Sequence, residues 1–209
     1  IENPITFSGA VTQKGLVAWE PGLRLSSFIR NPDKDLEPAV DFEIGLIVRR
    51  INQKRDIEVL RFQLSEVLLT PGGPGDPVLQ PNDEVYVFDP ESNRSAVLEG
   101  VVARLDRQAT YSNWSRTVTL RGAVSGAGRF PLPIGDFHVT DLLLLSGGGT
   151  NVASDVELDI SLIVRRANDR FRVEAIPFNL GKALSEPHSA EDPVLSPLDE
   201  VLIFNNVSA

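Results

Sequence analysis

One stretch of sequence occurs twice in the chain: Asp76–Phe88 reads DPVLQPNDEVYVF, and Asp192–Phe204 reads DPVLSPLDEVLIF. The second copy lies 116 residues after the first, and at the same offset Leu46–Arg50 (LIVRR) returns as Leu162–Arg166. Further matches are Phe62–Leu64 with Phe178–Leu180 at that offset, and Gly9–Val11 with Gly122–Val124 at an offset of 113. So many ordered matches predict two homologous structural units.

The repeat predicts three segments: a first unit over residues 1–89, a connector over 90–116 and a second unit over 117–209. The charges agree with two equivalent units. Residues 1–89 carry 9 basic and 14 acidic side chains, and residues 120–209 carry 7 and 12, so each has a net charge of −5. The segment between them has a net charge of +1. The acidity therefore belongs to the repeat and not to a tail.

The composition of the 209 residues excludes several classes of protein. The chain has no Cys, which removes disulfide scaffolds, thiolate zinc sites and cysteine nucleophiles. A formal net charge of −9 disfavours general binding of nucleic acid. The apolar runs, such as Leu142–Leu145, are far shorter than the roughly 20 residues that span a bilayer. Because the chain begins at Ile1 and holds no Met, we expect a processed chain or an excised fragment.

The second unit shows clear secondary-structure signals. Alternating residues predict strands over 117–124 and 129–132, and a short helix follows over 139–145, with Thr140 as a cap for its first turn. Strands are expected over 158–166, 171–178 and 200–204. The first unit gives the same order, with a weaker helix at 25–29 that ends before Pro32. The order strand, strand, helix and three strands predicts an α+β fold made of two tandem β-grasp units.

The connector between the units is predicted to be an amphipathic helix. Its apolar residues recur at helical spacing on one stripe: Val97, Leu98, Val101, Val102 and Leu105. We expect this helix, Ser95–Gln108, to pack on one unit and to set the angle between the two. An interface with another subunit is the alternative.

These features together resemble a known module, the SLBB (soluble-ligand-binding β-grasp) domain. In the second unit the positions that carry the resemblance are Gly122, Gly128, Phe130, Asp141, Leu142, Gly147, Gly148, Arg165, Leu195, Pro197, Asp199 and Val201. Tandem copies joined by a helix are similar to the periplasmic portion of bacterial polysaccharide biosynthesis/export proteins, the outer-membrane family that secretes capsule and exopolysaccharide. The resemblance implies a periplasmic location, self-association or contact with other export subunits, and possible contact with polysaccharide.

The chain also departs from that family. The first unit lacks the Gly-Gly after its helix and has Asn31-Pro32 instead. The export-defining domain that normally precedes these modules is absent from the sequence.

Candidate ligand-binding residues are the arginines that close one strand in each unit, and the two tryptophans. The guanidinium groups of Arg49, Arg50, Arg165 and Arg166 could bind a carboxylate or sulfate of an acidic glycan. The alternative for these arginines is an ion pair with a nearby Asp or Glu at a solvated strand end. Trp19 and Trp114 lie in or near turns and could stack on sugar rings, although most aromatic side chains are expected in the core.

The remaining polar motifs do not indicate catalysis. The pairs Asp83-Glu84 and Asp199-Glu200 sit at a turn before a strand, where adjacent side chains point to opposite faces and cannot flank one bond. His138 and His188 have no sequence neighbour that suggests a catalytic or metal-binding role. We therefore expect no catalytic residue, no metal ligand and no cofactor.

The leading hypothesis is a non-enzymatic periplasmic SLBB portion of a capsule or exopolysaccharide export protein. It would support the export conduit by glycan contact, subunit contact or both. A small-ligand (cobalamin-type) binding module is the main alternative. A DNA-uptake module and a glycan-active enzyme are weaker alternatives, the former because of the net charge and the latter because no nucleophile and base are paired in the sequence.

Overall fold

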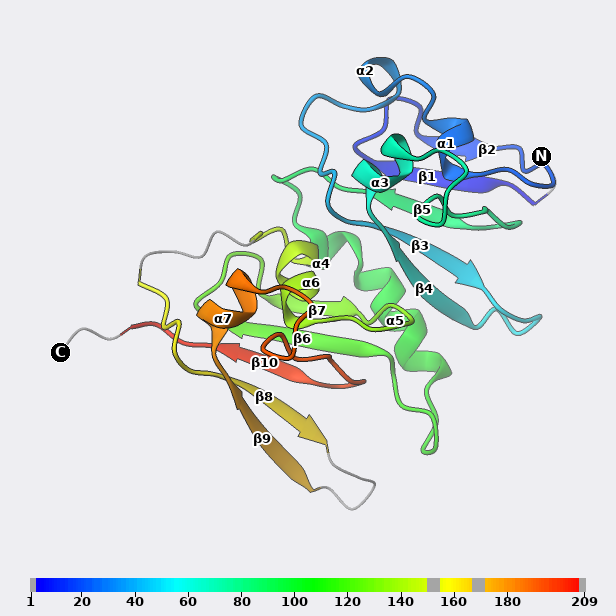
Figure 1. Ribbon diagram of the computed structural model, residues 1–209. Helices are drawn as coiled ribbons and strands as arrows, with labels where there is room; N and C mark the ends of the chain where they lie inside the picture. The colour runs from blue at the N-terminus through cyan, green and yellow to red at the C-terminus, as the bar shows by residue number, and fades with distance from the viewer. Residues whose placement is uncertain (1–2, 150–154, 167–171, 207–209) are drawn as a thin grey trace. The chain divides into compact units, whose positions relative to one another are not determined.

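The computed structural model describes residues 3–149, 155–166 and 172–206. The chain divides into two compact units, Ile1–Ser92 (unit 1) and Asn93–Ala209 (unit 2), each with mixed α and β structure. Each unit contains one five-stranded sheet (Figure 1). Residues 93–116 of the predicted connector lie in unit 2.

Unit 1 contains a mixed sheet whose first and last strands are neighbours. The strand order is β2-β1-β5-β3-β4; β1 and β5 run parallel, and the other pairs are antiparallel. The strands are β1 (Ile5–Gly9), β2 (Gly15–Val17), β3 (Gly45–Arg50), β4 (Ile57–Phe62) and β5 (Glu84–Val87), and the helices are α1 (Leu25–Phe28), α2 (Pro32–Asp35) and α3 (Leu64–Leu69). Pro32, which was expected only to stop the preceding helix, also begins α2 at its first turn, where its missing N–H is not needed.

The core of unit 1 forms where α1 and α3 pack over the sheet (Figure 1). It includes Ile5 and Phe7 of β1, Val85 of β5, Leu25 of α1 and Leu64 of α3, all of them buried. Alternation along β1 then directs Thr6 and Ser8 to the opposite face of the sheet. This second face is important for the candidate site.

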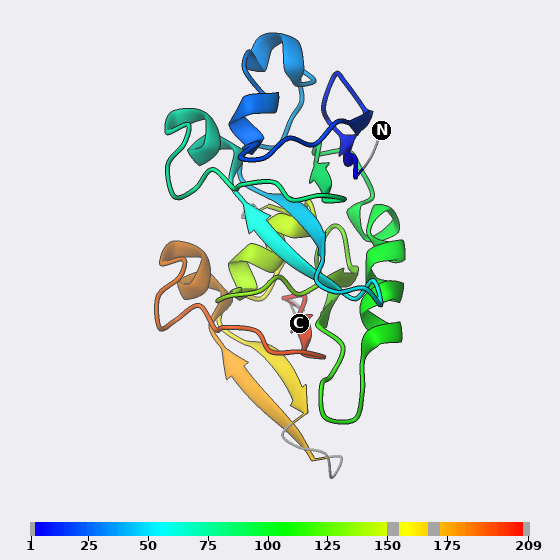
Figure 2. The same ribbon diagram turned by 90° about the vertical axis from the view of Figure 1, so that its right-hand side faces the viewer.

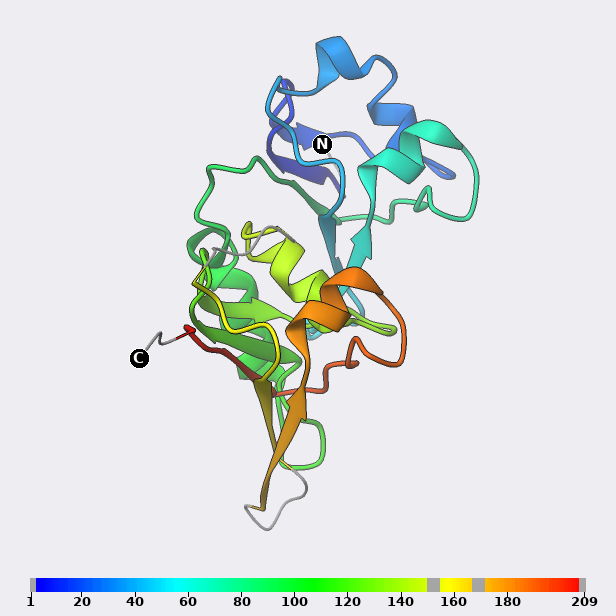
Figure 3. The ribbon, with the colours of Figure 1, turned by 60° about the vertical axis from the view of Figure 1, so that its left-hand side comes forward.

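Unit 2 repeats the same sheet with strand order β7-β6-β10-β8-β9. The strands are β6 (Thr117–Gly122), β7 (Gly128–Pro131), β8 (Ser161–Arg166), β9 (Val173–Phe178) and β10 (Glu200–Ile203), and the helices are α4 (Arg94–Val97), α5 (Glu99–Gln108), α6 (Val139–Leu145) and α7 (Leu180–Ser185). β6 and β10 are parallel, as β1 and β5 are in unit 1. Figure 3 shows α6 and α7 together beside this sheet.

The repeated Gly-Ala-Val motif marks the same backbone feature in both units. Gly9 and Gly122 end the first strand with φ angles of +90° and +98°. A Cβ atom at either glycine would lie under 2 Å from a carbonyl oxygen, that of Val87 or Ile203. The next residue then donates its N–H to that same oxygen, at 2.8 Å in both cases. Only glycine fits such a left-handed close approach, which explains why the motif recurs.

The buried residues Asp76 and Asp192 fix the N-terminus of a helix that is distant in sequence. In unit 2 the carboxylate of Asp192 accepts hydrogen bonds from the Thr140 hydroxyl, the Thr140 N–H and the His188 N–H. In unit 1 the carboxylate of Asp76 accepts the equivalent bonds from the Ser26 hydroxyl and N–H and from the N–H of Gly72. The prediction that Thr140 caps its own helix was therefore wrong: His138 is the N-cap residue, and the Thr140 hydroxyl donates to Asp192.

The connector forms two helices, α4 and α5, and both pack on the β6–β7 hairpin of unit 2 (Figure 2). Leu98, Val101, Val102 and Leu105 are buried as the spacing predicted. Val97, the last residue of α4, was predicted in the same stripe but is 48% exposed, because the connector forms two helices and not one. The Arg94 side chain in α4 is buried, and its Nη1 donates to the Leu144 carbonyl near the C-terminus of α6, at 2.9 Å. Among the described residues, no helix has the length and apolar character needed to cross a membrane.

Candidate functional site

Arg49 is held in a buried ion pair. Its Nε donates to Asp83 Oδ1 at 3.1 Å and its Nη2 donates to Asp83 Oδ2 at 2.8 Å. Nη2 also donates to the Val78 carbonyl, and the carboxylate accepts the N–H of Gln80. The Asp83 side chain is fully buried. The pair joins the end of β3 to the turn before β5.

Unit 2 contains the same arrangement. Arg165 donates from Nε and Nη2 to the buried carboxylate of Asp199, with a shortest distance of 2.6 Å, and from Nη2 to the Val194 carbonyl. Asp199 also accepts the N–H of Ser196. The hydrogen bonds to Asp199 raise the pKa of Arg165, although partial burial acts in the opposite direction. Arg49 and Arg165 thus have partners within their own units, as the ion-pair alternative expected, but the carboxylate is buried and not solvated.

The glutamate of each acidic pair lies on the other face of the sheet from the aspartate. Glu200 accepts from Arg121 at 2.6 Å, while Asp199 binds Arg165. Glu84 lines a hollow on the face of the unit-1 sheet that carries Thr6 and Ser8. These positions agree with the turn interpretation and with the alternation of side chains in a strand.

The hollow on unit 1 brings one predicted arginine to a surface that could hold a ligand. It has a volume of about 240 Å³ and is lined by Arg50, the exposed residue that follows Arg49 at the end of β3. Its lining residues are Pro4, Thr6, Ser8, Leu16, Arg50, Asn82, Glu84 and Tyr86. The Tyr86 hydroxyl donates to Glu84 at 3.3 Å, so an aromatic ring, a carboxylate and a guanidinium lie in one depression.

The equivalent face of unit 2 has a different surface. Position 16, which is Leu in unit 1, corresponds to Arg129 in unit 2, because these residues pair with Thr6 and Thr119 in the same register. Arg129 donates from both Nη atoms to Asp106 of α5, at 2.9 Å each. The helix α5 is therefore tied to the sheet face that forms the hollow in unit 1.

Neither tryptophan is fully exposed. Trp19 packs against the core cluster of unit 1 and donates its ring N–H to the Leu79 carbonyl at 2.9 Å. Trp114 is half-buried in the segment that precedes β6. Arg166 is exposed at the end of β8. The structure brings none of these three residues into the hollow that contains Arg50.

The two histidines lie together, which the sequence analysis missed. His138 and His188 have ring centroids 4.8 Å apart, and both face the buried carboxylate of Asp141. Neither histidine has a neighbour in the sequence that indicates this arrangement, because the residues that meet here are up to 50 positions apart. A residue-by-residue alignment of the repeats contains a signal for this: His188 replaces Gly72 at an offset of 116, in a loop where both residues have a positive φ angle.

Neither the protein-family models nor the curated proteins give a match.

Proposed function

We propose that each unit is a β-grasp module of the SLBB type. Three features support this: the strand order, the parallel pairing of the first and last strands, and a helix that follows the first hairpin and packs on the sheet. The ion pairs Arg49–Asp83 and Arg165–Asp199 add support, because they join two parts of the SLBB sequence frame, the Val-Arg-Arg strand and the Pro-x-Asp-Glu-Val turn.

On this basis the chain is a non-enzymatic, periplasmic portion of a bacterial capsule or exopolysaccharide export protein. Its role is to support the export conduit through glycan contact, subunit contact or both. The observation that carries the proposal is the exact repetition of one sheet topology with its buried ion pair, together with the sequence resemblance. Because the arginines and aspartates of the two ion pairs hold the fold, we expect the surrounding surfaces to recognise a ligand.

The hollow on unit 1 is the surface we propose for glycan contact. Asn82 and Glu84 present polar groups to sugar hydroxyls, and the half-buried ring of Tyr86 offers an apolar surface beside them. Arg50 adds a cation that can pair with a carboxylate on an acidic sugar. A depression of this size suits a single sugar residue of a chain better than a whole folded partner.

Oligosaccharide titration tests the glycan contact. Neutral dextrin fragments and acidic oligogalacturonides would be titrated into the labelled chain and followed by nuclear magnetic resonance. We expect shifts at Asn82, Glu84 and Tyr86, and binding of the acidic fragments about tenfold weaker in Arg50→Ala, because one charge-assisted hydrogen bond is lost. Arg166→Ala is the matched control, since it removes the equivalent exposed arginine of unit 2 and should leave binding unchanged.

Sedimentation velocity tests the subunit contact on the same samples. Concentration-dependent association would support that part of the proposal. A chain that stays monomeric and binds no fragment of the panel contradicts both parts. Calorimetry with cyanocobalamin separates the small-ligand alternative, which requires saturable binding of that molecule.

A further inference from the structure

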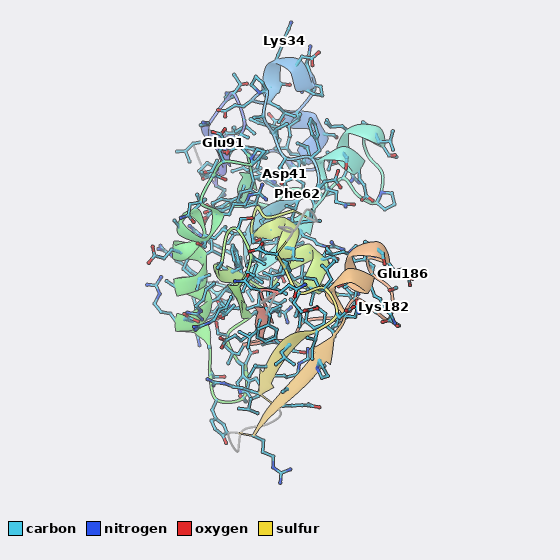
Figure 4. All side chains as sticks on the ribbon, turned by 90° about the vertical axis from the view of Figure 1, so that its left-hand side faces the viewer. Lys34, Asp41, Phe62, Glu91, Lys182 and Glu186 are labelled. Atoms are coloured by element: carbon cyan, nitrogen blue, oxygen red, sulfur yellow. The ribbon has the colours of Figure 1, made fainter. Side chains whose placement is uncertain are left out.

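Three side chains of unit 2 converge at the beginning of α6. His138 is the N-cap of the helix, Asp141 lies three residues further on, and His188 lies in the loop after α7. His188 Nε2 is 3.0 Å from Asp141 Oδ1, and His138 Nδ1 is 3.7 Å from Asp141 Oδ2. One ligand atom from each residue lies within 4.8 Å of the other two. Figure 4 labels Lys182 and Glu186, which mark α7 and the turn that leads to the His188 loop.

The convergence is fixed by the fold of unit 2. Asp192 binds both the first turn of α6, through Thr140, and the N–H of His188. The backbone N–H of His138 donates to Asp141 Oδ2 at 2.9 Å and orients the carboxylate. These hydrogen bonds hold the loop and the helix together without a bound ligand. Metal ligands in proteins are commonly oriented by hydrogen bonds of this kind.

The state of one ring nitrogen indicates that the cluster lacks a component. The Nδ1 atom of His138 is buried and makes no hydrogen bond of normal geometry among the described residues, although the Asp141 N–H faces the same side chain in the capping box of α6. The distance of 3.7 Å from this Nδ1 atom to Asp141 Oδ2 is too long for a hydrogen bond, so the nearest carboxylate does not satisfy it. A buried polar atom without a partner destabilises the folded state, which is why such atoms are rare.

The distances suit ligands of one ion. Bond lengths of about 2.0 Å in a tetrahedral site place the ligand atoms about 3.3 Å apart. The 3.0 Å and 3.7 Å distances end on different oxygens of Asp141, and one ligand atom from each residue lies within 4.8 Å of the others, so a bound ion would draw the side chains slightly closer together. Two imidazoles and one carboxylate form a donor set that zinc uses, with a fourth position left for water. His188 is 43% exposed, so the site has an opening to solvent, whereas the Asp141 carboxylate is 1% exposed.

We propose that His138, Asp141 and His188 form a binding site for Zn²⁺ or a similar divalent first-row ion. The ion accepts the lone pair of His138 Nδ1 and joins the loop after α7 to the N-terminus of α6. Unit 1 lacks this site, because the residue in the loop position of His188 is Gly72 and the N-cap of α1 is Arg24. The site therefore distinguishes the two copies of the module.

Calorimetric titration of the metal-free chain with ZnCl₂ tests the proposal. We expect one ion per chain, with binding at least tenfold weaker in His188→Gly and in Asp141→Asn. His188→Gly is suited to this test because Gly72 occupies the equivalent loop position in unit 1 with a φ angle of +80°, so the backbone accepts glycine there. Glu191→Gln is the control, since Glu191 pairs with Lys182 and lies outside the cluster.

Thermal unfolding gives an independent measurement. Zn²⁺ should raise the melting temperature of the native chain and not that of His188→Gly, because an ion that binds the folded state stabilises it. Circular dichroism checks that each variant is folded without metal. Absence of saturable binding, or equal binding by the native chain and both site variants, would overturn the proposal. This outcome has no bearing on glycan or subunit contact.

Discussion

Units 1 and 2 share one sheet topology but differ in what lies on each side of it. On one face of the unit-2 sheet, Arg129 of β7 binds Asp106 of α5, whereas the same face of the unit-1 sheet has Leu16 and a hollow. At the start of the helix on the other face, unit 2 has two histidines where unit 1 has Arg24 and Gly72. Shared residues such as Asp83 and Asp199 are buried and hold the fold, whereas residues around the candidate sites, such as Leu16 and Arg129, differ between the units. The two copies thus keep one frame and differ in these surfaces.

The ion pairs test how equivalent the two frames are, and they carry the largest expected effect. Arg49→Ala and Arg165→Ala each leave a buried carboxylate without its cation, and each should destabilise its own unit by about 3–5 kcal/mol. Trp19 and Trp114 report on the two units separately, because each unit contains one tryptophan. Each effect is measured by urea unfolding monitored by tryptophan fluorescence, in a chain whose tryptophan in the other unit is replaced by Phe.

The controls for these variants are Arg50→Ala and Arg166→Ala, which remove the exposed neighbours and should change stability by less than about 0.5 kcal/mol. A loss in unit 1 well below that in unit 2 would show that the two frames are not energetically equivalent.

A swap at the turn before the last strand sharpens the comparison. Asn82 and Leu198 occupy equivalent positions with φ angles of +65° and +67°. The left-handed region suits Asn and strains Leu by about 1 kcal/mol. We expect Leu198→Asn to stabilise unit 2, and Asn82→Leu to destabilise unit 1, by about that amount in urea unfolding. Two changes of the same sign would refute the equivalence of the turns.

The smallest expected effect concerns the attachment of α5. The hydrogen bonds from Arg129 and then from Ser115 lower the pKa of Asp106 below its ordinary value of 3.8, against partial burial that raises it. The stability that the Arg129–Asp106 pair contributes is therefore fully present above about pH 4, and it is lost as the pH falls through the lowered pKa of Asp106. Because both side chains are partly exposed, screening limits it to less than about 1 kcal/mol.

Unfolding of the native chain and of Arg129→Ala between pH 2.5 and pH 6 measures this contribution. The difference between them should be largest above pH 4 and should vanish at the acid end. Asp106→Asn should show the same loss at neutral pH. A difference that does not depend on pH would mean that Arg129 acts by packing alone.

Much of the fold could be predicted from the sequence, because periodicity and the repeat report on burial. The stripe of α5, the hairpins and the helix after Gly135 follow from local patterns. The environment of Arg49 could not be predicted, because the partner, Asp83, is 34 residues away and reaches it only when β3 pairs with β5. The same is true of His138 and His188, which are 50 residues apart in sequence and are brought together by Asp192.

The position of β5 and β10 has a consequence for how the chain folds. Each is the last strand of its unit in sequence but the central strand of its sheet, paired with the first strand on one side and the third on the other. Phe7 meets Val85 only after a loop of nearly 80 residues closes, so each unit has a high contact order and is expected to fold slowly. During synthesis, β1 and β3 remain without their shared partner until that strand emerges. A nascent unit therefore exposes two strand edges, which makes it vulnerable to aggregation until its final residues are added.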